Sequence, residues 1–320
     1  MCCLFGLIDY GHALTGREKT KLVRALAVEA EARGTDAAGI AYNSGGRLRV
    51  YKRPWPARFL RFKVPNDAYA VMGHTRLTTQ GNERFNYNNH PFPAHVPGAD
   101  FALAHNGILY NDDTLRKQHK LPDTRIQTDS YVAVQLLEHR QELTIDSLAW
   151  MVEQLTGSYC FSVLDGKNNL YLVKGDNPLC LVHYPRLGLY LYASTKEILF
   201  RALDRRPPCA EAPVEVTLDA GDILKIDTLG GATMGRFDPS NLYQRWGCYS
   251  DWDYYPRWPL RTKPTFPVPD PSYLEDLKAV AASCGWDPTN IDRLLAQGFT
   301  CEEIEEYLYE SPGEGCLCEL

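Results

Sequence analysis

The sequence lacks the features that mark several classes of protein. No apolar run is longer than a strand, so no membrane-spanning helix is expected. The first residues, MCCLFGLIDYGH, lack the basic start and long apolar stretch of a secretory signal. There is no dense run of Lys and Arg, the net charge is −6, and no G-x-x-x-x-G-K-[ST] phosphate loop is present. We therefore expect neither a membrane nor a nucleic-acid partner.

The cysteines form no recognisable framework. Ten are scattered over 320 residues, and only Cys316 and Cys318 form a C-x-C pair, with no second pair at the spacing of a zinc site. Without an export signal, reduced thiols are the better interpretation. We expect a cytoplasmic protein that needs no metal and no cofactor.

Residues 2 to about 230 alternate between short apolar runs and longer amphipathic segments. Several runs are joined by short turns such as Ser44-Gly45-Gly46, and short turns connect antiparallel neighbours. Strands are expected over residues 4–8, 38–42, 48–51, 69–74, 101–105, 159–164, 170–173 and 189–193. This pattern predicts an α+β protein with helices packed outside antiparallel sheets.

Helices are expected between these strands. The first begins at the capping box Thr15–Glu18 and should stop at Gly34. Two more are expected over residues 129–139 and 145–155, the second with apolar residues at i, i+3, i+4 and i+7. A further helix follows residue 193, and we predict Ser194 as its N-cap with Glu197 three residues later.

The composition changes near residue 240. Residues 245–260, RWGCYSDWDYYPRWPL, are rich in Trp and Tyr, and the prolines that recur up to Pro271 exclude a regular helix or central strand. Three short helices are expected afterwards, over 274–283, 290–296 and 301–309, the last with a capping box from Thr300 to Glu303. The predicted organisation is a domain of residues 2–235, an aromatic linker of 236–271, a three-helix module of 272–310 and a tail of 311–320.

Cys2 is a candidate nucleophile because of its place in the sequence. A small second residue permits removal of Met1, which would leave Cys2 with a free α-amine. Such an amine has a reference pKa of about 7.7–8.0, so it can act as a base beside its own thiol. Alone, Cys2 could equally be a small residue of the core. Other segments must decide between the two.

Four polar segments, residues 33–39, 73–81, 105–108 and 127–129, adjoin predicted strands or helices. A site for a free amino acid needs a cation for the carboxylate, an anion for the ammonium, and donors for the oxygen of the reacting amide. Arg76, Asp129 and the pair Asn106-Gly107 are of these types. Taken singly, each also fits a surface ion pair, a helix N-terminus or a turn.

Taken in order, the segments resemble the class II glutamine amidotransferase domain, whose fold is that of the N-terminal nucleophile hydrolases. The family's opening Met-Cys-Gly-Ile-x-Gly and its later motifs RG-x-D-x-x-G, GH-x-R, N-x-HP, HNG, TD, L-x-G-x-Y and AS have counterparts in this sequence. They are residues 1–6, 33–39, 73–76, 88–91, 105–107, 128–129, 155–159 and 193–194. The resemblance covers roughly residues 2–230, and loop 76–81 is most similar to the glutaminase domain of glucosamine-6-phosphate synthase. It implies a four-layer αββα sandwich of two antiparallel sheets.

The resemblance also implies a catalytic role for three residues. Cys2 would attack the side-chain amide carbon of glutamine and form a thioester, its own amine relaying the proton to the departing ammonia. The side-chain N–H of Asn106 and the backbone N–H of Gly107 would form the oxyanion hole.

The same resemblance implies a set of substrate-binding residues. Arg76, assisted by Thr79 and Gln80, would hold the substrate carboxylate, and Asp129 would hold the α-ammonium. The loop of residues 77–81 would close over bound glutamine and exclude water.

Three positions depart from the family pattern. Cys3 replaces the usual glycine beside the nucleophile, and Leu77 stands where the synthase has an aromatic residue between its two active sites. Gln80 replaces a histidine of the synthase. These changes bear on gating and on ammonia transfer rather than on hydrolysis.

Nothing after the matched region resembles the acceptor domain of a full synthase. We therefore expect a free-standing glutaminase whose ammonia is used by a separate synthase or transferase, docked on the aromatic linker or the terminal helices. Two alternatives remain open: an amidase of the same fold for another small amide, and a catalytically silent binding module.

Overall fold

The computed structural model describes residues 2–242, 271–283 and 285–296, together with residues 299, 301, 304 and 308. The chain divides into two compact units, Met1–Arg261 and Thr262–Leu320, which are described separately. Most of the expected aromatic linker, the capping box Thr300–Glu303 and the tail with Cys316 and Cys318 lie outside the described residues.

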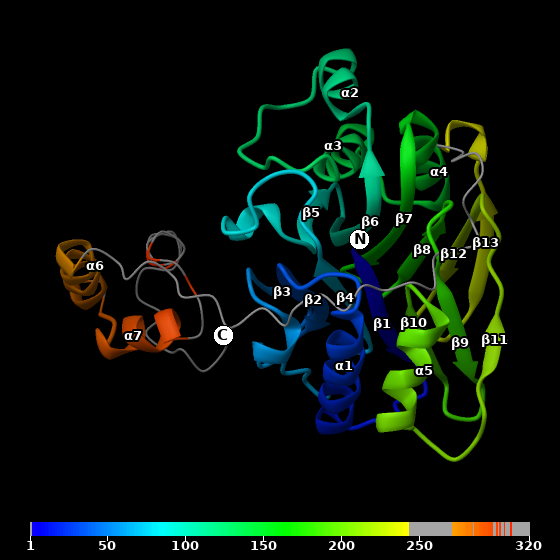
Figure 1. Cartoon of the computed structure of the whole chain (residues 1–320), viewed down its shortest axis with the longest axis horizontal. Coiled ribbons are helices and arrows are strands. Elements are labelled where there is room, and N and C mark those ends of the chain that lie inside the picture. Colours follow the sequence, from blue (N-terminus) through cyan, green and yellow to red (C-terminus); the bar gives the residue numbers. More distant parts are fainter. Residues whose placement is uncertain are drawn as a thin grey trace. The chain divides into compact units, whose positions relative to one another are not determined.

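The first unit contains two sheets whose named strand pairs are all antiparallel (Figure 1). The larger sheet has the order β11-β9-β10-β1-β4-β2-β3 and the smaller β13-β12-β8-β7-β6-β5. The larger sheet comprises β1 (Cys3–Asp9), β2 (Ala37–Ser44), β3 (Arg47–Arg53), β4 (Ala70–Arg76), β9 (Cys180–Tyr184), β10 (Leu189–Ala193) and β11 (Val214–Val216). The smaller comprises β5 (Phe92–Val96), β6 (Ala99–Leu109), β7 (Gly157–Asp165), β8 (Leu170–Lys174), β12 (Asp222–Ile226) and β13 (Ala232–Arg236).

Helices cover the outer faces of both sheets. On the larger sheet, α1 (Gly16–Ala30) packs against β1 and β4, and α5 (Lys196–Arg205) lies beside α1. On the smaller, α3 (Tyr131–Arg140) and α4 (Ile145–Gln154) contact β5 and β12, and α2 (Asp112–Gln118) lies next to α3 (Figure 1). Short 3-10 turns occupy Ala57–Phe59, Asn86–Asn88 and Pro239–Asn241. The expected α+β sandwich of four layers is confirmed.

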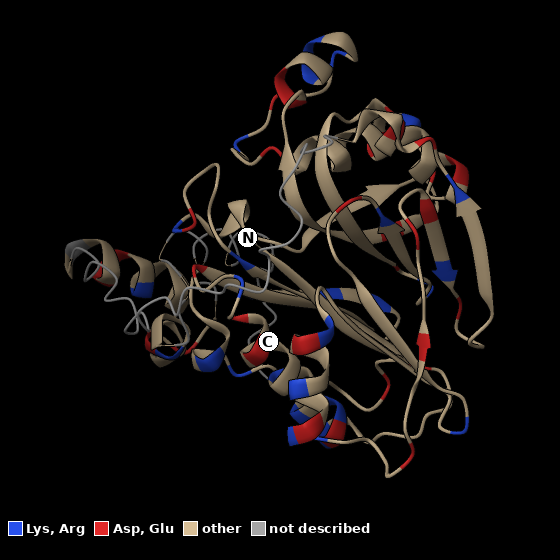
Figure 2. Ribbon diagram, turned by 45° about the vertical axis from the view of Figure 1, so that its right-hand side comes forward, with Lys and Arg blue, Asp and Glu red and all other residues tan. Residues whose placement is uncertain are grey.

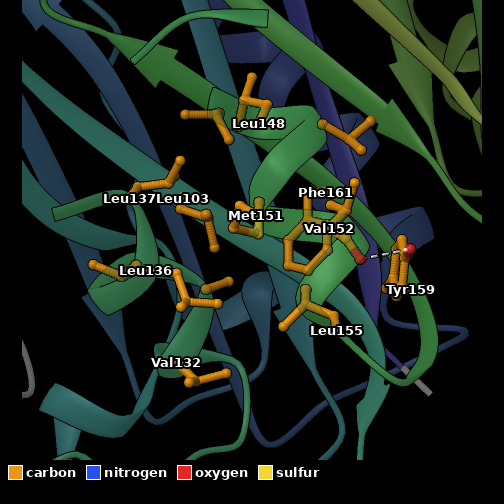
Figure 3. Packing of buried hydrophobic residues seen from close by; sticks show 14 of the residues in the cluster. Leu103, Val132, Leu136, Leu137, Leu148, Met151, Val152, Leu155, Tyr159 and Phe161 are labelled. Atoms are coloured by element: carbon orange, nitrogen blue, oxygen red, sulfur yellow. Dashed lines mark hydrogen bonds between the residues drawn. The ribbon is translucent and has the colours of Figure 1, made fainter. Parts of the chain in front are cut away.

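The apolar spacing predicted for α4 buries one face of this helix in a core beside the smaller sheet. Leu148, Met151 and Val152 are buried against β6 and β7 (Figure 3). Tyr159 of β7 donates its hydroxyl to the Val152 carbonyl at 3.2 Å, which satisfies a buried polar group. Each such buried side chain contributes about 1.5–3 kcal/mol relative to an exposed one. A second core lies between the sheets, where residues of β1, β2 and β4 meet residues of β6, β7 and β8.

Two helix boundaries differ from the prediction. The capping box of α1 is present, but the helix ends at Ala30 rather than at Gly34 because turns begin at Glu31. The N-cap of α5 is Thr195, which accepts from Ile198 N–H at 3.3 Å, and not Ser194. The Ser194 side chain instead reaches into the interior, which bears on the site described below.

The second unit contains α6 (Pro271–Ser283) and α7 (Thr289–Ala296), and residues 301, 304 and 308 are also helical. It has its own core, made by Leu277, Ala281, Trp286, Ile291, Leu294, Cys301, Ile304 and Leu308. In the described part of the chain, no helix has both the length and the apolar character that crossing a membrane requires. Lys and Arg are interspersed with Asp and Glu along the helices (Figure 2).

Candidate active site

Cys2 immediately precedes β1, which is the central strand of the larger sheet. Its side chain is 9% exposed, and its thiol donates to the Leu77 carbonyl at 3.6 Å. Its own carbonyl accepts from Arg33 Nε at 2.8 Å. Burial raises the pKa of the Cys2 thiol, while the charge of Arg76 lowers it and that of Asp129 raises it. The thiol is therefore protonated at neutral pH and needs a base before it can attack.

The segment between α1 and β2 makes hydrogen bonds both to Cys2 and to the loop after β4. Arg33 bonds to Cys2, and three residues further Asp36 accepts from Thr78 N–H at 2.8 Å. Gly34 lies against the backbone of residues 76 and 77, where an added Cβ would come within 2.5 Å of the Leu77 nitrogen. Only glycine permits this approach. The RG-x-D pattern therefore joins nucleophile and loop.

Arg76 ends β4 and carries a buried positive charge. Its guanidinium donates to Asn89 Oδ1 at 2.7 Å and to the Gln80 carbonyl at 2.5 Å. Both partners are neutral, and within the described residues no carboxylate comes within ion-pair distance of Arg76. A buried, unneutralised cation is costly unless an anion completes the site.

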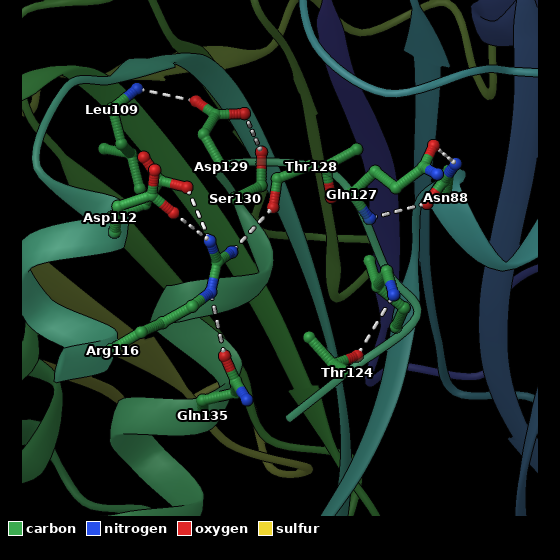
Figure 4. A network of polar contacts seen from close by, with 12 residues as sticks. Asn88, Leu109, Asp112, Arg116, Thr124, Gln127, Thr128, Asp129, Ser130 and Gln135 are labelled. Atoms are coloured by element: carbon green, nitrogen blue, oxygen red, sulfur yellow. Dashed lines mark hydrogen bonds and ion pairs between the residues drawn. The ribbon is translucent and has the colours of Figure 1, made fainter. Parts of the chain in front are cut away.

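Asp129 supplies the opposite charge. It is 4% exposed and accepts from Leu109 N–H at 2.6 Å, while the Ser130 hydroxyl lies 3.4 Å from its other oxygen (Figure 4). In the described part of the protein it, too, has no ion-pair partner of opposite charge. The charges of Arg76 and Asp129 both act on the Cys2 thiol, so the structure brings the three groups together.

The segment that carries Asp129 is braced on two sides (Figure 4). Arg116 of α2 donates to the Thr128 carbonyl at 3.3 Å and is itself paired with Asp112 at 2.8 Å. Gln127 donates its N–H to Asn88 Oδ1 at 2.8 Å and accepts from Asn88 Nδ2 at 3.1 Å. Asn88, from the N-x-HP motif, therefore ties the loop after β4 to the Asp129 segment.

Asn106 and Gly107 lie in β6, on the smaller sheet. Asn106 is fully buried, and its Nδ2 lies 3.3 Å from Ser194 Oγ at the end of β10. Gly107 has φ +146°, and an added Cβ would collide with the Ser158 carbonyl. The position therefore requires glycine. Asn106 comes close to β1 through Ser194, which bonds to Leu4.

Thr79 and Gln80 differ from the other expected site residues. Both are exposed, and Gln80 contacts Arg76 through its backbone carbonyl. Arg33, Asp36, Asn89, Arg116 and Ser194 were given no part in the site by the sequence, although Arg33 and Asp36 stand in the RG-x-D motif and Ser194, predicted as a helix N-cap, stands in the AS motif. Their contacts make them part of the site's support.

Three buried histidines lie beside the site. His74 Nε2 donates to the His105 carbonyl at 2.9 Å and so links β4 to β6, one strand from each sheet. His105 Nδ1 is 2.8 Å from Ser130 Oγ, and the His74 and His90 rings lie 4.2 Å apart. Burial is the main cause that lowers the pKa of all three, and the pKa of His74 falls to about 3.

We expect the fold to lose stability as the pH falls below 6.5. Between pH 6.5 and about 3 the unfolded chain binds a proton at position 74 that the folded protein does not. His74 alone should then cost about 1.4 kcal/mol of unfolding free energy per pH unit, and nothing above pH 6.5. Urea unfolding of the protein and of His74→Gln at pH 7, 6 and 5 measures this slope.

The exposed His95, replaced as His95→Gln, is the matched control for this experiment. His95→Gln should leave the dependence of the unfolding free energy on pH nearly unchanged. His74→Gln should reduce the slope of this dependence by the contribution of nearly one bound proton. Equal slopes for the protein and for His74→Gln would contradict the account.

No cluster of three His, Cys, Asp or Glu residues that could bind a metal is found among the described residues. The groups that the described residues bring to the candidate site are a thiol, two buried charges of opposite sign and amide donors.

Residues 74–201 match the model of a glutamine amidotransferase domain. Among curated relatives, the glutamine–fructose-6-phosphate aminotransferase of Staphylococcus epidermidis is 33% identical over 189 residues, which are 56% of this chain and 30% of that protein. The Chlamydia trachomatis enzyme is 34% identical over 191 residues, 57% and 30% of the two chains. The chain thus spans about 30% of the length of these relatives.

A solved structure shares the fold. Glutamine phosphoribosylpyrophosphate amidotransferase from B. subtilis superposes with a TM-score of 0.59 at 22% identity, covering 74% of this chain and 49% of that one. The two-sheet sandwich is therefore the fold of that amidotransferase structure. Residues 74–201 thus match a glutamine amidotransferase domain, and the fold of the first unit agrees with that match.

Proposed function

We propose that this domain hydrolyses the side-chain amide of glutamine to glutamate and ammonia. One observation carries the proposal: two buried groups of opposite charge, Arg76 and Asp129, both act electrostatically on the Cys2 thiol, and neither has an ion-pair partner among the described residues. A free α-amino acid brings a carboxylate and an ammonium that would neutralise both. A simple amide would leave them unpaired, which favours glutamine over other amide substrates.

The proposed reaction begins with Cys2 after removal of Met1. The α-amine takes the thiol proton, and the sulfur forms a bond to the amide carbon of glutamine. The tetrahedral intermediate collapses as the C–N bond breaks, and the amine delivers its proton to the departing ammonia. Water then attacks the γ-glutamyl thioester, which yields glutamate and restores the thiol. No redox partner or cofactor is consumed.

Asn106 and Gly107 are proposed to stabilise the oxyanion of that intermediate. One such donor typically contributes about 2.7–4 kcal/mol to transition-state stabilisation. Thr79 and Gln80 are proposed to assist Arg76 once the exposed loop 77–81 closes on the substrate.

Asn89→Asp tests the assignment of Arg76. Asn89 accepts from Arg76 Nη1 at 2.7 Å and is fully buried, so a carboxylate here would neutralise the guanidinium and compete with the substrate carboxylate. We expect the KM for glutamine to rise about 10- to 100-fold, corresponding to ~1.4–2.7 kcal/mol, with kcat within about 3-fold. Steady-state ammonia release measures both constants.

Asn82→Asp is the matched control, because it adds the same charge to the same loop where its side chain already accepts from Arg84 N–H. It should leave the KM nearly unchanged. 4-Aminobutanamide, which lacks the α-carboxylate, should be hydrolysed equally by the protein and by Asn89→Asp. A loss of the same size on both substrates would refute the role given to Arg76.

We further propose that the ammonia is used by a separate synthase or transferase. Residues 2–235 would then be the amidotransferase domain. Residues 272–310 would form a helical module with its own core, and the acceptor protein would dock on this module. Mixing the protein with candidate acceptors and measuring glutamine-dependent amination tests this. If no acceptor raised glutamine turnover, the separate partner would be abandoned while glutamine hydrolysis still stood.

A further inference from the structure

Ser194 lies between the strand that follows the nucleophile and the oxyanion donor. Its side chain is fully buried, and its Oγ accepts from Leu4 N–H at 2.8 Å, two residues after Cys2. Its backbone N–H donates to the Leu4 carbonyl at 2.9 Å, which fixes Ser194 relative to β1. The same hydroxyl contacts Asn106 on the other sheet.

The hydrogen bonds around this hydroxyl are unbalanced. Ser194 Oγ faces two N–H donors, Leu4 N at 2.8 Å and Asn106 Nδ2 at 3.3 Å, whereas the acceptors around its own hydrogen are the Leu4 carbonyl at 3.5 Å and the neighbouring Cys3 thiol. Asn106 Oδ1 is buried and has no hydrogen-bond partner among the described residues. Buried polar atoms of native proteins are nearly always satisfied.

Rotating the Asn106 side-chain amide by half a turn removes both the excess of donors at Ser194 Oγ and the unsatisfied Asn106 oxygen. It exchanges Oδ1 and Nδ2, so that the Ser194 hydroxyl donates to Oδ1 and keeps Leu4 N–H as the donor to its own oxygen. Both hydrogens of Nδ2 then become free. In the unturned orientation one of the two N–H groups is directed at Ser194 Oγ, and only the other is available to the substrate.

We propose that Ser194 is a positioning residue that holds the Asn106 amide in the orientation in which it donates to the oxyanion. The inference rests on the proposed glutamine hydrolysis and adds to it a residue that no motif or comparison assigns to the reaction. The backbone that carries Cys2 thereby also orients the group that stabilises the intermediate formed on Cys2. Ser194 itself does not touch the substrate.

A double-mutant cycle tests this proposal through kcat and KM for glutamine. Asn106→Ala should lower kcat about 10²- to 10³-fold. Ser194→Ala should lower kcat about 10- to 100-fold, with KM within about 3-fold, because the freed amide spends much of its time turned away. In the Asn106→Ala background, Ser194→Ala should lower kcat by less than about 2-fold, because the amide it orients is gone.

Ser162→Ala is the matched control, since Ser162 is another fully buried serine, on β7, outside the proposed machinery. It should keep kcat within about 2-fold of the unmodified protein. Should Ser194→Ala fail to fold, Ser194→Cys preserves the volume with a weak donor and should show the same loss of kcat.

Two results would overturn the inference alone: full kcat in both Ser194 variants, or losses that multiply with that of Asn106→Ala. The second would mean that Ser194 acts only by supporting Leu4. Full kcat in Asn106→Ala would remove the oxyanion role of Asn106 itself, and the proposal for Ser194 with it. The two failures are therefore distinguishable.

Discussion

Cys2→Ala is expected to abolish ammonia release from glutamine. Among the described thiols, Cys2 is the one that would carry a free α-amine once Met1 is removed, whereas Cys3, Cys160 and Cys180 lie within strands, Cys209 follows α5 and Cys301 belongs to the second unit. Loss of the nucleophile in enzymes with covalent intermediates costs up to about 10⁶-fold in kcat, and we expect at least about 10⁴-fold here. Ammonia release under saturating glutamine measures the effect.

Glutamine binding provides the control for that variant. Arg76 and Asp129 remain in place in Cys2→Ala, so calorimetry should still detect glutamine with an affinity within about 10-fold of the KM. Cys160→Ala should retain kcat, because Cys160 belongs to the core between the sheets. Residual turnover above about 1% in Cys2→Ala would contradict the assignment of the nucleophile.

Asp129→Asn is expected to have the second largest effect. The amide keeps an oxygen that can accept from Leu109 N–H but loses the charge that would meet the α-ammonium. Removing one partner of a buried charge pair costs about 2–5 kcal/mol, so kcat/KM for glutamine should fall about 30- to 5,000-fold. With glutaramate, which lacks the α-amine, the fall should be less than about 3-fold.

Asp67→Asn is the matched control, because Asp67 is a surface carboxylate that caps the β2–β3 hairpin through Gly45 N–H at 2.9 Å. It should change kcat/KM for neither substrate. Equal losses on glutamine and glutaramate in Asp129→Asn would show that Asp129 supports the structure rather than reading the α-amine.

The sequence predicted those parts of the fold in which periodicity is strong. The apolar spacing of α4 was recognisable because one face of the helix is buried, and β1, β4 and β6 were recognisable as runs of mostly buried residues. The expectations missed β5, β9, β11, β12 and β13. β11 and β13 are largely exposed and show no alternation. β9 and β12 are mostly buried but short, and β5 contains Pro93, which is unfavourable in a strand. They missed α2 because seven mostly polar residues carry no apolar stripe.

Within the site, motifs predicted residue types but not partners. Ser194 was taken for a helix cap because Ser194 and Thr195 stand side by side and either could precede the helix. Only the structure shows that Thr195 caps while Ser194 points inward. Asn89 escaped notice because its contact with Arg76 joins positions that follow separate elements, and it occupies the open x of N-x-HP.

The three residues that depart from the family pattern, Cys3, Leu77 and Gln80, differ in how deeply they are buried. Cys3 is fully buried in β1, pairs in register with Thr75 and donates to the Leu4 carbonyl at 3.3 Å, so the strand accommodates its extra atoms. Leu77 serves Cys2 through its carbonyl, which any residue could supply. Gln80 likewise serves Arg76 through its backbone. These contacts do not require the family's side chains.

Intact-protein and peptide mass spectrometry after treatment with a glutamine-mimicking electrophile tests the central claim most directly. The account predicts a chain without Met1 that carries one adduct, located on Cys2, and a rate of labelling that excess glutamine suppresses. A chain that keeps Met1, or a label that falls on another cysteine and is indifferent to glutamine, would contradict it.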